Sequence, residues 1–223
     1  MGKLSIVATP IGNLEDITLR ALRTLKECDV IYAEDTRVIS KLLVRYEIQK
    51  PLQRLDAATE SKKAEDIIAR LEAGEHVAFV SDAGTPAVSD PGSRLVGAVR
   101  ARGWTAIEAI PGPSALTAAV SIAGLAAGEF FFIGFLPHKK GRQTAIKHIA
   151  ESDVPVVLYE SPHRILKLLR ELSQAGVSKV GVARELTKMH EEFISGTPEE
   201  IAQSLEARGA VRGEFVVIIE PRD

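Results

Sequence analysis

The 223-residue chain contains 28 Lys and Arg against 30 Asp and Glu, which gives a formal net charge of −2, and 5% of its residues are aromatic. A chain of this length forms one or two domains and buries enough surface to fold without a disulfide framework or a structural metal. The slight acidic excess and the few aromatic side chains argue against a protein that coats nucleic acid. The single cysteine, Cys28, excludes an internal disulfide, so we expect a cytoplasmic protein in which Cys28 is an ordinary buried residue.

No targeting or membrane segment is expected. The first residues, up to Ile11, carry one lysine and a short apolar run that ends at Pro10, which is unlike a signal peptide. The stretch 109–128 has no charge, but its prolines, glycines and alanines make it too weakly hydrophobic for a membrane span. We therefore expect a buried helix of a soluble protein there.

Short apolar runs alternate with amphipathic patterns along the chain. Near-continuous Val, Ile and Phe content suits strands of a sheet that is covered on both faces. Strands are predicted at Leu4–Ala8, Val30–Ala33, Val77–Val80, Thr105–Ile110, Phe130–Phe135, Val154–Tyr159, Val180–Ala183 and Phe215–Ile219. Helices are predicted at Ile17–Leu25, Arg37–Tyr46, Lys62–Glu72, Ser93–Arg102, Ser114–Ile122, Arg142–Glu151, Arg164–Ala175 and Glu199–Ala207. This alternation is typical of an α/β fold with largely parallel sheets.

The same pattern predicts two α/β lobes. A boundary is expected at Pro111-Gly112-Pro113, or after the next helix at 124–128. We place the N-terminal lobe at residues 1–113 and the C-terminal lobe at residues 114–223, each about 100 residues long, which is a common domain size. The small-residue helix 114–127 could bridge the two lobes.

One long loop, residues 80–92, follows a predicted strand and precedes a predicted helix. Gly84 and its small neighbours would let a ligand approach the main chain, and two prolines stiffen the loop. Asp82 and Asp90 could accept hydrogen bonds from a ligand. Alternatively, the segment is only a tight loop in which Ser89 and Asp90 cap the next helix.

Two further Gly/Pro loops, residues 8–14 and 110–116, also follow predicted strands. Ser114 is either a helix N-cap or part of a group of amides that holds a polar ligand. Open α/β sheets bind ligands at the carboxyl ends of their strands, so the three loops together predict one site lined by main chain. The chain lacks the G-x-G-x-x-G fingerprint and the G-x-x-x-x-G-K-[ST] loop, so nucleoside triphosphate hydrolysis is not expected.

Charged clusters follow other strands, at 34–37, 160–164 and 184–192. Each could be a substrate site or an ordinary set of surface ion pairs and helix caps. A basic stretch at 139–148 could contact phosphates or form a solvated helix face. The five histidines show no H-E-x-x-H spacing, and there is no G-x-S-x-G motif, so neither a zinc site nor a serine hydrolase is predicted.

Taken together in this order, the motifs resemble the ribosomal RNA small-subunit methyltransferase I family of the tetrapyrrole-methylase-like superfamily. The resemblance extends from Leu4 to Glu220. It rests on T-P-I-G-N-L at 9–14 with Asp16, E-D-T-R at 34–37, the loop 81–92, P-G-P-S-A at 111–115, F-I-G-F-L-P at 132–137, Y-E-S-P-H-R at 159–164 and R-E-L-T-K at 184–188.

The resemblance implies a two-domain α/β enzyme, with a mixed or mostly parallel sheet and flanking helices in each lobe. It implies that S-adenosyl-L-methionine binds in a cleft between the lobes, and that the second lobe closes this cleft. The implied reaction is methylation of the ribose 2′-hydroxyl of a cytidine of 16S rRNA at the decoding centre, with the rRNA in the small ribosomal subunit as partner. It also implies a homodimer.

Site residues follow from the resemblance position by position. The implied cofactor-binding residues are Pro10, Asp82, Ala83, Gly84, Thr85, Pro86, Ser114, Ala115, Tyr159, Arg184 and Gly213. The candidates on the substrate side are Asp35, Arg37, Glu60, Arg164, Glu185 and Lys188. A ribose hydroxyl is a poor nucleophile, so a base or a cation that stabilises the alkoxide would help, but the sequence assigns no general base.

The chain departs from the family pattern at two places. Many relatives carry a His-rich stretch that ends in Asn-Glu where this chain has D-A-A-T-E at 56–60, so only Glu60 matches. Many relatives also continue past the last strand into a helical extension, whereas this sequence ends at Asp223, which puts RNA binding in question. Two alternatives stay open: a small-molecule methyltransferase of the same fold, of the tetrapyrrole type, and a non-enzymatic RNA-binding protein.

Overall fold

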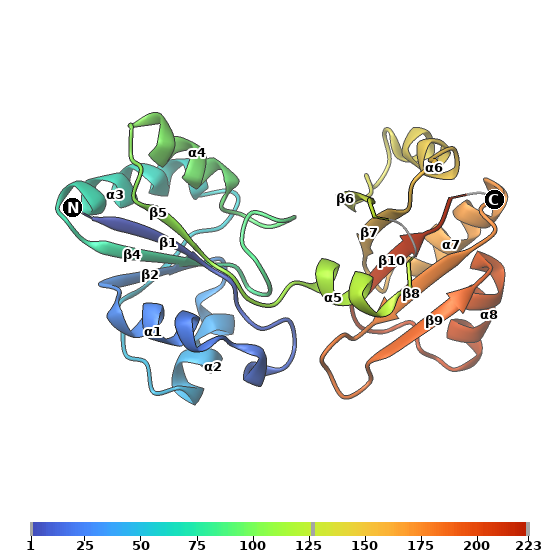
Figure 1. Ribbon diagram of the computed structural model, residues 1–223, viewed down its shortest axis with the longest axis horizontal. Coiled ribbons are helices and arrows are strands. Elements are labelled where there is room, and N and C mark those ends of the chain that lie inside the picture. Colours follow the sequence, from blue (N-terminus) through green and yellow to red (C-terminus); the bar gives the residue numbers. More distant parts are fainter. Residues whose placement is uncertain (1, 126–127, 222–223) are drawn as a thin grey trace. The chain divides into compact units, whose positions relative to one another are not determined.

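The computed structural model describes residues 2–125 and 128–221. The chain divides into two compact units, Met1–Ser114 and Ala115–Asp223, which we call the first and the second unit (Figure 1). Each unit has a five-stranded sheet and hydrophobic core clusters of its own. Within the described residues, no helix combines the length and the apolar character that a membrane crossing requires.

The first unit is built on a parallel sheet with the strand order β3-β2-β4-β1-β5. Its strands are β1 (Lys3–Val7), β2 (Val30–Ala33), β3 (Leu52–Arg54), β4 (His76–Val80) and β5 (Ile107–Ile110). Its helices are the 3₁₀ turn η1 (Leu14–Asp16) and α1 (Leu19–Glu27), α2 (Thr36–Arg45), α3 (Glu60–Glu72) and α4 (Ser93–Ala101).

Helices cover both faces of this sheet (Figure 1). Leu25 of α1 and Leu42 of α2 pack into one core cluster, and Ile67 of α3 and Leu95 of α4 pack into the other. The chain therefore leaves β1 with a helix on one face and leaves β4, its neighbour, with a helix on the opposite face. The carboxyl ends of the strands are the edge at which open α/β sheets bind ligands.

The second unit has a mixed sheet with the order β6-β7-β10-β8-β9. Its strands are β6 (Phe131–Phe135), β7 (Val156–Glu160), β8 (Val180–Arg184), β9 (Glu192–Gly196) and β10 (Phe215–Ile219). Its helices are α5 (Ala115–Ile122), α6 (Arg142–Ala150), α7 (Ile165–Gln174) and α8 (Pro198–Ala207). β6 and β7 are parallel, whereas β10 is antiparallel to both β7 and β8, and β8 is antiparallel to β9.

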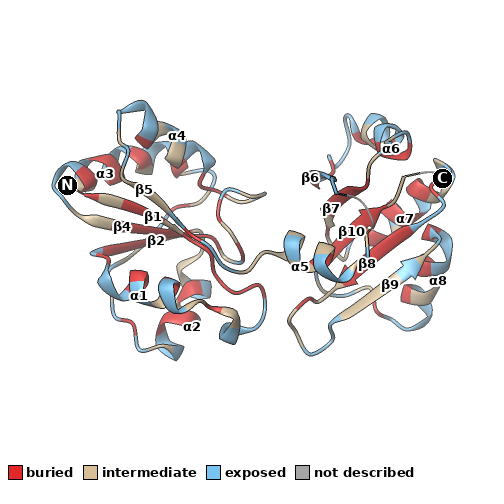
Figure 2. Ribbon diagram, in the orientation of Figure 1, coloured by how far each residue is buried: buried red, intermediate tan, exposed pale blue. Residues whose placement is uncertain are grey.

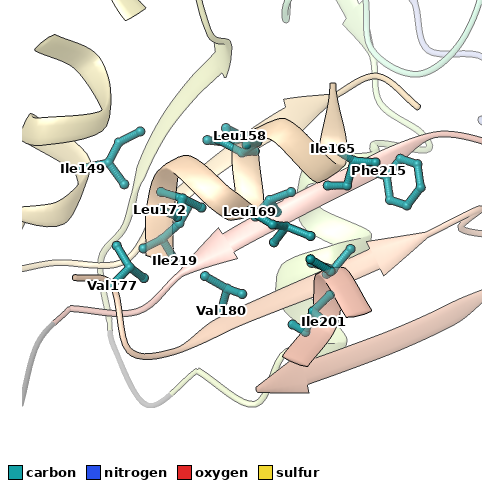
Figure 3. Packing of buried hydrophobic residues seen from close by; sticks show 14 of the residues in the cluster. Ile149, Leu158, Ile165, Leu169, Leu172, Val177, Val180, Ile201, Phe215 and Ile219 are labelled. Carbon is teal, nitrogen blue, oxygen red and sulfur yellow. The ribbon is translucent and has the colours of Figure 1, made fainter. Parts of the chain in front are cut away.

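Helices α6, α7 and α8 pack against one face of this sheet. Figure 3 shows Leu158, Val180 and Phe215 from the strands beside Ile165 and Leu169 from α7, and all five belong to one buried cluster. Alternate strand residues such as Val216 point to the other face, where α5 packs against β10. The strands β7, β8 and β10 are accordingly buried along most of their length (Figure 2).

The predicted α/β fold is confirmed, and each predicted strand and helix is present with ends that lie within two residues of the prediction. Cys28 is fully buried as expected, and burial raises the pKa of its thiol to about 11. The strands β3 and β9 were not predicted. β3 is a three-residue edge strand with two exposed polar side chains, and β9 is an edge strand that follows a charged run, so neither has the apolar pattern of a central strand.

The second sheet is mixed, one of the two arrangements that the resemblance implied. It is less parallel than the alternation of elements alone indicated, because the short connection from β8 to β9 cannot make the crossover that parallel pairing needs. One expectation about the second half of the chain is wrong. The buried helix expected within 109–128 is mostly exposed or half-buried: Ala119 is the one buried residue described in α5. Residues 126 and 127 of that stretch lie outside the described residues.

Candidate functional site

Three loops of the first unit meet at the carboxyl ends of β1, β4 and β5. Thr9 and Gly84 exchange two main-chain hydrogen bonds of 2.9 Å. The Thr9 hydroxyl donates to the Ser81 carbonyl at 3.2 Å, and the Thr85 hydroxyl donates to the Pro113 carbonyl at 3.3 Å. The three Gly/Pro loops noted in the sequence are thus joined to one another, and we call this region the loop edge.

Gly84 lies at the centre of the loop edge with φ +76°, a conformation that glycine adopts without strain. A Cβ atom at this position would lie 3.4 Å from Ile11 Cγ2 and 3.7 Å from the Pro113 carbonyl oxygen. Ala87 and Ser89, later in the same loop, also have positive φ, at 69° and 67°. Strained backbone of this kind is concentrated at ligand-binding sites in proteins, so it supports a functional role for the loop.

The other predicted cofactor residues of this unit lie along the same three loops, at different depths. Ala83 is exposed, Asp82, Thr85 and Ser114 are half-buried, and Pro10 and Pro86 are buried. The two buried prolines therefore constrain the loop backbone from the interior of the unit.

Carboxyl groups make the loop edge acidic. The Asp82 carboxylate accepts a hydrogen bond of 2.8 Å from the Asp35 main-chain N–H, which joins the end of β4 to the end of β2. Burial, together with repulsion from Glu34 and Asp82, raises the pKa of the Asp90 carboxyl to about 6. Burial and the charge of Asp82 likewise raise the pKa of Glu34. These three carboxyl groups would be stabilised by a cationic ligand.

Asp35 and Arg37 form a local pair at the start of α2. Asp35 is the N-cap, accepting from the Arg37 main-chain N–H at 2.8 Å, and it also accepts from Arg37 Nε at 3.0 Å. The side-chain hydrogen bond from Arg37 lowers the pKa of the Asp35 carboxyl to about 2. The carboxylate is therefore a weak base, while the Arg37 side chain is 88% exposed.

Glu60 has a structural position in the first unit. Its side chain is buried, and Oε1 accepts hydrogen bonds of 2.9 Å from the main-chain N–H groups of Gly92 and Leu95. Glu60 thus caps the N-terminus of α4 from the neighbouring helix, where the sequence suggested Ser89 or Asp90 as the cap. The sequence lacks a signal for this arrangement, because the carboxylate comes from a residue 32 positions away.

The candidates of the second unit gather at one edge of its sheet. Glu160 and Arg184, the last residues of β7 and β8, are both aligned with Phe215, the first residue of β10. Glu185 Oε1 accepts from Lys188 Nζ at 2.9 Å and from the Glu214 N–H at 3.0 Å. The sequence segments around 160, 184 and 213 are therefore neighbours.

Two residues hold this edge in shape. Arg184 Nε donates to the Arg212 carbonyl at 2.8 Å, and its guanidinium pairs with Glu192 at 2.9 Å. Gly213 has φ +103°, and a Cβ atom there would lie 2.5 Å from the Glu185 carboxyl carbon. A glycine is needed because the Glu185 side chain lies directly on the turn.

Glu185 and Lys188 form a charged pair in this second-unit edge. Burial opposes ionisation of Glu185, but the hydrogen bonds from Lys188 and the Glu214 N–H outweigh it and lower the pKa of the carboxyl. Burial similarly opposes the charge on Lys188, but Glu185 and Glu214 raise its pKa. Lys188 is accordingly a stable cation at neutral pH.

Tyr159 and Arg164 lie near the end of β7. The Leu116 N–H donates to the Tyr159 hydroxyl at 3.2 Å, which places Tyr159 at the start of α5, where Ala115 lies. Arg164 pairs with Glu160 at 2.7 Å and donates to the Leu136 carbonyl at 3.0 Å. Arg164 is thus engaged in holding a neighbouring loop.

Within the described ranges, no group of three or more His, Cys, Asp or Glu residues is arranged to hold a metal ion. The described residues form two candidate sites: a main-chain-lined, acidic loop edge in the first unit and a charged edge in the second. The sequence identified the loops of the first, but not the Thr9–Gly84 pairing or the influence of Glu34 on Asp90, which depend on the strand order.

Known proteins resemble this chain over most of its length. Residues 3–202 match the family model of the Tetrapyrrole (Corrin/Porphyrin) Methylases. A Thermotoga maritima protein named ribosomal RNA small subunit methyltransferase I is 44% identical over 224 residues, covering 100% of both chains. A relative of the same name from Neisseria meningitidis serogroup A is 45% identical and covers 99% of this chain and 76% of its own length.

Solved structures share the fold at low sequence identity. A cobalt precorrin-4 methyltransferase superposes with a TM-score of 0.72 at 18% identity, covering 97% of this chain and 94% of its own. A diphthine synthase gives a TM-score of 0.71 at 17% identity, with 97% and 89% coverage. With fold, family model and full-length relatives in agreement, the chain belongs to the tetrapyrrole methylase family, whose methyl donor is S-adenosylmethionine.

Proposed function

We propose that this protein is a methyltransferase of small-subunit ribosomal RNA that methylates the 2′-hydroxyl of a cytidine at the decoding centre of 16S rRNA. The observation that carries the proposal is the end-to-end match to the Thermotoga maritima relative of that name. The family resemblance of the motifs supports the finer points: the ribose 2′-oxygen as acceptor, the small ribosomal subunit as the particle that presents it, a homodimer, and the cytoplasm as location.

The loop edge of the first unit fits the methyl donor chemically. S-adenosylmethionine supplies a methyl group on a positively charged sulfonium and also carries an ammonium group, and Asp82 and Asp90 with Glu34 form an acidic cluster in the loop edge. Gly84 has no Cβ atom, so a ligand can approach its main chain more closely than that of any other residue type. We therefore assign donor binding to the loops that contain Pro10, Asp82–Pro86 and Ser114. The contributions of Ala115, Tyr159, Arg184 and Gly213, and the cleft-closing role of residues 114–223, stay predictions.

The acceptor hydroxyl must lose a proton as it is methylated, and positioning supplies much of the remaining rate. A carboxylate with a raised pKa is the better base near neutral pH, so Asp90 and Glu34 suit this task and Asp35 does not. Arg37 and Lys188 are cations that could stabilise negative charge on the acceptor oxygen or bind phosphate. Glu185 positions Lys188, and Arg164 positions a loop. We do not include Glu60 among the residues that act on the substrate, because its carboxylate caps α4.

Transfer of labelled methyl groups tests the proposal. The protein is incubated with methyl-labelled S-adenosylmethionine and either small ribosomal subunits from a strain that lacks this modification or a reduced tetrapyrrole. We expect label in 16S rRNA and none in the tetrapyrrole. Label in the tetrapyrrole alone would favour a small-molecule methyltransferase, and absence of donor binding at millimolar concentration in calorimetry would favour a non-enzymatic RNA-binding protein.

A further inference from the structure

The loop between β6 and α6 presents three basic side chains in succession: His138, Lys139 and Lys140. All three are exposed. Neither lysine forms an ion pair with any residue in the described parts of the chain, although most other charged clusters of the second unit are paired. We call residues 137–141 the basic loop.

Two largely buried arginines hold the main chain of the basic loop. Arg164 donates to the Leu136 carbonyl at 3.0 Å, and Arg142 donates to the Pro137 carbonyl at 3.4 Å. The Arg142 side chain is only 3% exposed, although the sequence suggested that it belongs to an exposed basic stretch. These contacts fix the point at which the loop leaves β6.

Buried carboxylates balance the charge of the two arginines. Arg142 pairs with Glu171 at 2.8 Å and lies 3.7 Å from Glu160, and Arg164 pairs with Glu160 at 2.7 Å. Burying four charges is costly and often adds little net stability, so such a network is better explained by the geometry that it enforces. Because its two positive and two negative charges cancel, the exposed lysines determine the sign of the loop.

The basic loop also lies at the edge of the second sheet where the other candidates gather. Phe135 of β6 is aligned with Tyr159 of β7, and Glu160 is aligned with the start of β10, as Arg184 is. A cationic loop is thus fixed on the same sheet edge as Lys188.

We propose that Lys139 and Lys140 are a preformed contact for the phosphate backbone of the RNA substrate, and that Arg142 and Arg164 are positioning residues that hold the loop in place for it. This inference rests on the proposed function and adds the surface that binds the RNA. Unpaired lysines neutralise phosphates without reading sequence, so they give affinity and registration rather than base specificity. A net charge of −2 for the whole chain is compatible with such a local contact.

The test is RNA binding by the Lys139→Ala/Lys140→Ala variant over a range of salt concentrations, with small ribosomal subunits or 16S rRNA as the probe. The loss of two phosphate contacts makes the negative slope of log K, where K is the association constant for RNA, against log salt concentration shallower by about 1.4–1.8. It also weakens RNA binding at 0.15 M salt by roughly 10- to 30-fold. We expect the KM for RNA to rise in parallel, while kcat at saturating RNA and calorimetric affinity for S-adenosylmethionine stay unchanged.

Two matched variants complete the experiment. Lys139→Arg/Lys140→Arg keeps both charges and is expected to restore affinity and slope, and Lys62→Ala/Lys63→Ala removes an adjacent lysine pair from α3 and is expected to change neither. Arg142→Lys retains the positive charge but cannot donate the same set of hydrogen bonds as the guanidinium. This variant should raise the KM for RNA with little change in kcat.

An unchanged salt slope in the Lys139/Lys140 double alanine variant, with the wild-type protein methylating RNA normally, would overturn the inference and leave the proposed function intact. A wild-type protein that binds the donor but methylates no RNA would instead contradict the proposed function itself.

Discussion

Gly84 and Gly103 have almost the same main-chain conformation, with φ at +76° and +75°, but different surroundings. A Cβ atom at Gly84 would contact Ile11 and Pro113, whereas one at Gly103 would meet nothing within 4 Å. Valine at either position introduces backbone strain of about 1–3 kcal/mol. Only at Gly84 would the side chain also occupy the surface that we assign to the donor.

We therefore expect Gly84→Val to weaken S-adenosylmethionine binding by at least about 10-fold, which is about 1.4 kcal/mol, and Gly103→Val to leave it unchanged. Isothermal calorimetry measures the affinity, and circular dichroism confirms that both variants are folded. Wild-type affinity in folded Gly84→Val would show that the donor binds elsewhere.

The Asp90 carboxyl should make stability depend on pH in a defined window. Its pKa is about 6 in the folded protein against 3.8 for an unperturbed aspartate, so the folded state holds the extra proton between these values. Stability contributed by this proton is therefore lost as the pH rises from about 4 to about 6.

Asp90→Asn removes the unfavourable buried charge. At pH 7 we expect the variant to be more stable than the wild type by about 1 kcal/mol, after allowance for solvent screening of this partly exposed group, and at pH 4 the gain should disappear. Urea unfolding at both pH values measures the difference, with the exposed Asp66→Asn as control. An equal gain at both pH values would exclude titration of Asp90 as its cause.

At the scale of elements, the start of α4 depends on a carboxylate from α3. Glu60→Ala leaves the N–H groups of Gly92 and Leu95 without their acceptor, and we expect a loss of about 2–4 kcal/mol in the free energy of unfolding. Glu60→Gln keeps an acceptor oxygen and should recover at least half of this loss, while Glu65→Ala, an exposed position on the same helix, should cost less than about 1 kcal/mol.

The same variants separate a structural from a catalytic role for Glu60. Urea denaturation gives the stabilities, and methyl transfer by Glu60→Gln at a temperature where it is fully folded should be close to wild type. A large drop in kcat for folded Glu60→Gln would show that Glu60 acts on the substrate.

Elements with a strong local pattern were predictable from the sequence, and those that depend on pairing partners were not. The helix at 165–174 has apolar residues at helical spacing, so its limits were found within a residue. Edge strand β9 has charged and polar residues and becomes a strand through pairing with β8. Missing it also concealed the antiparallel hairpin, which is why the alternation of elements alone indicated largely parallel sheets.

At the scale of the whole molecule, the sequence located the candidate site better than it assigned roles within it. Gly/Pro loops follow strands visibly in the sequence, so the loop edge could be predicted. The roles of Glu60 and Arg142 depend on burial, which turns two charged residues of apparently exposed segments into internal supports. Local charge likewise matters more than the total of −2, because the lysines of the basic loop have no ion pair within the described residues, whereas the buried Arg142 is paired with Glu171.

The proposed function is methylation of a ribose hydroxyl of small-subunit RNA. The most direct test is nucleoside mass spectrometry of 16S rRNA after small subunits that lack the modification are incubated with the protein and S-adenosylmethionine. We predict one new modified nucleoside, 2′-O-methylcytidine, which is absent when the donor is omitted. A base-methylated nucleoside, or no new modified nucleoside from subunits that a related methyltransferase does modify, would contradict the proposed function.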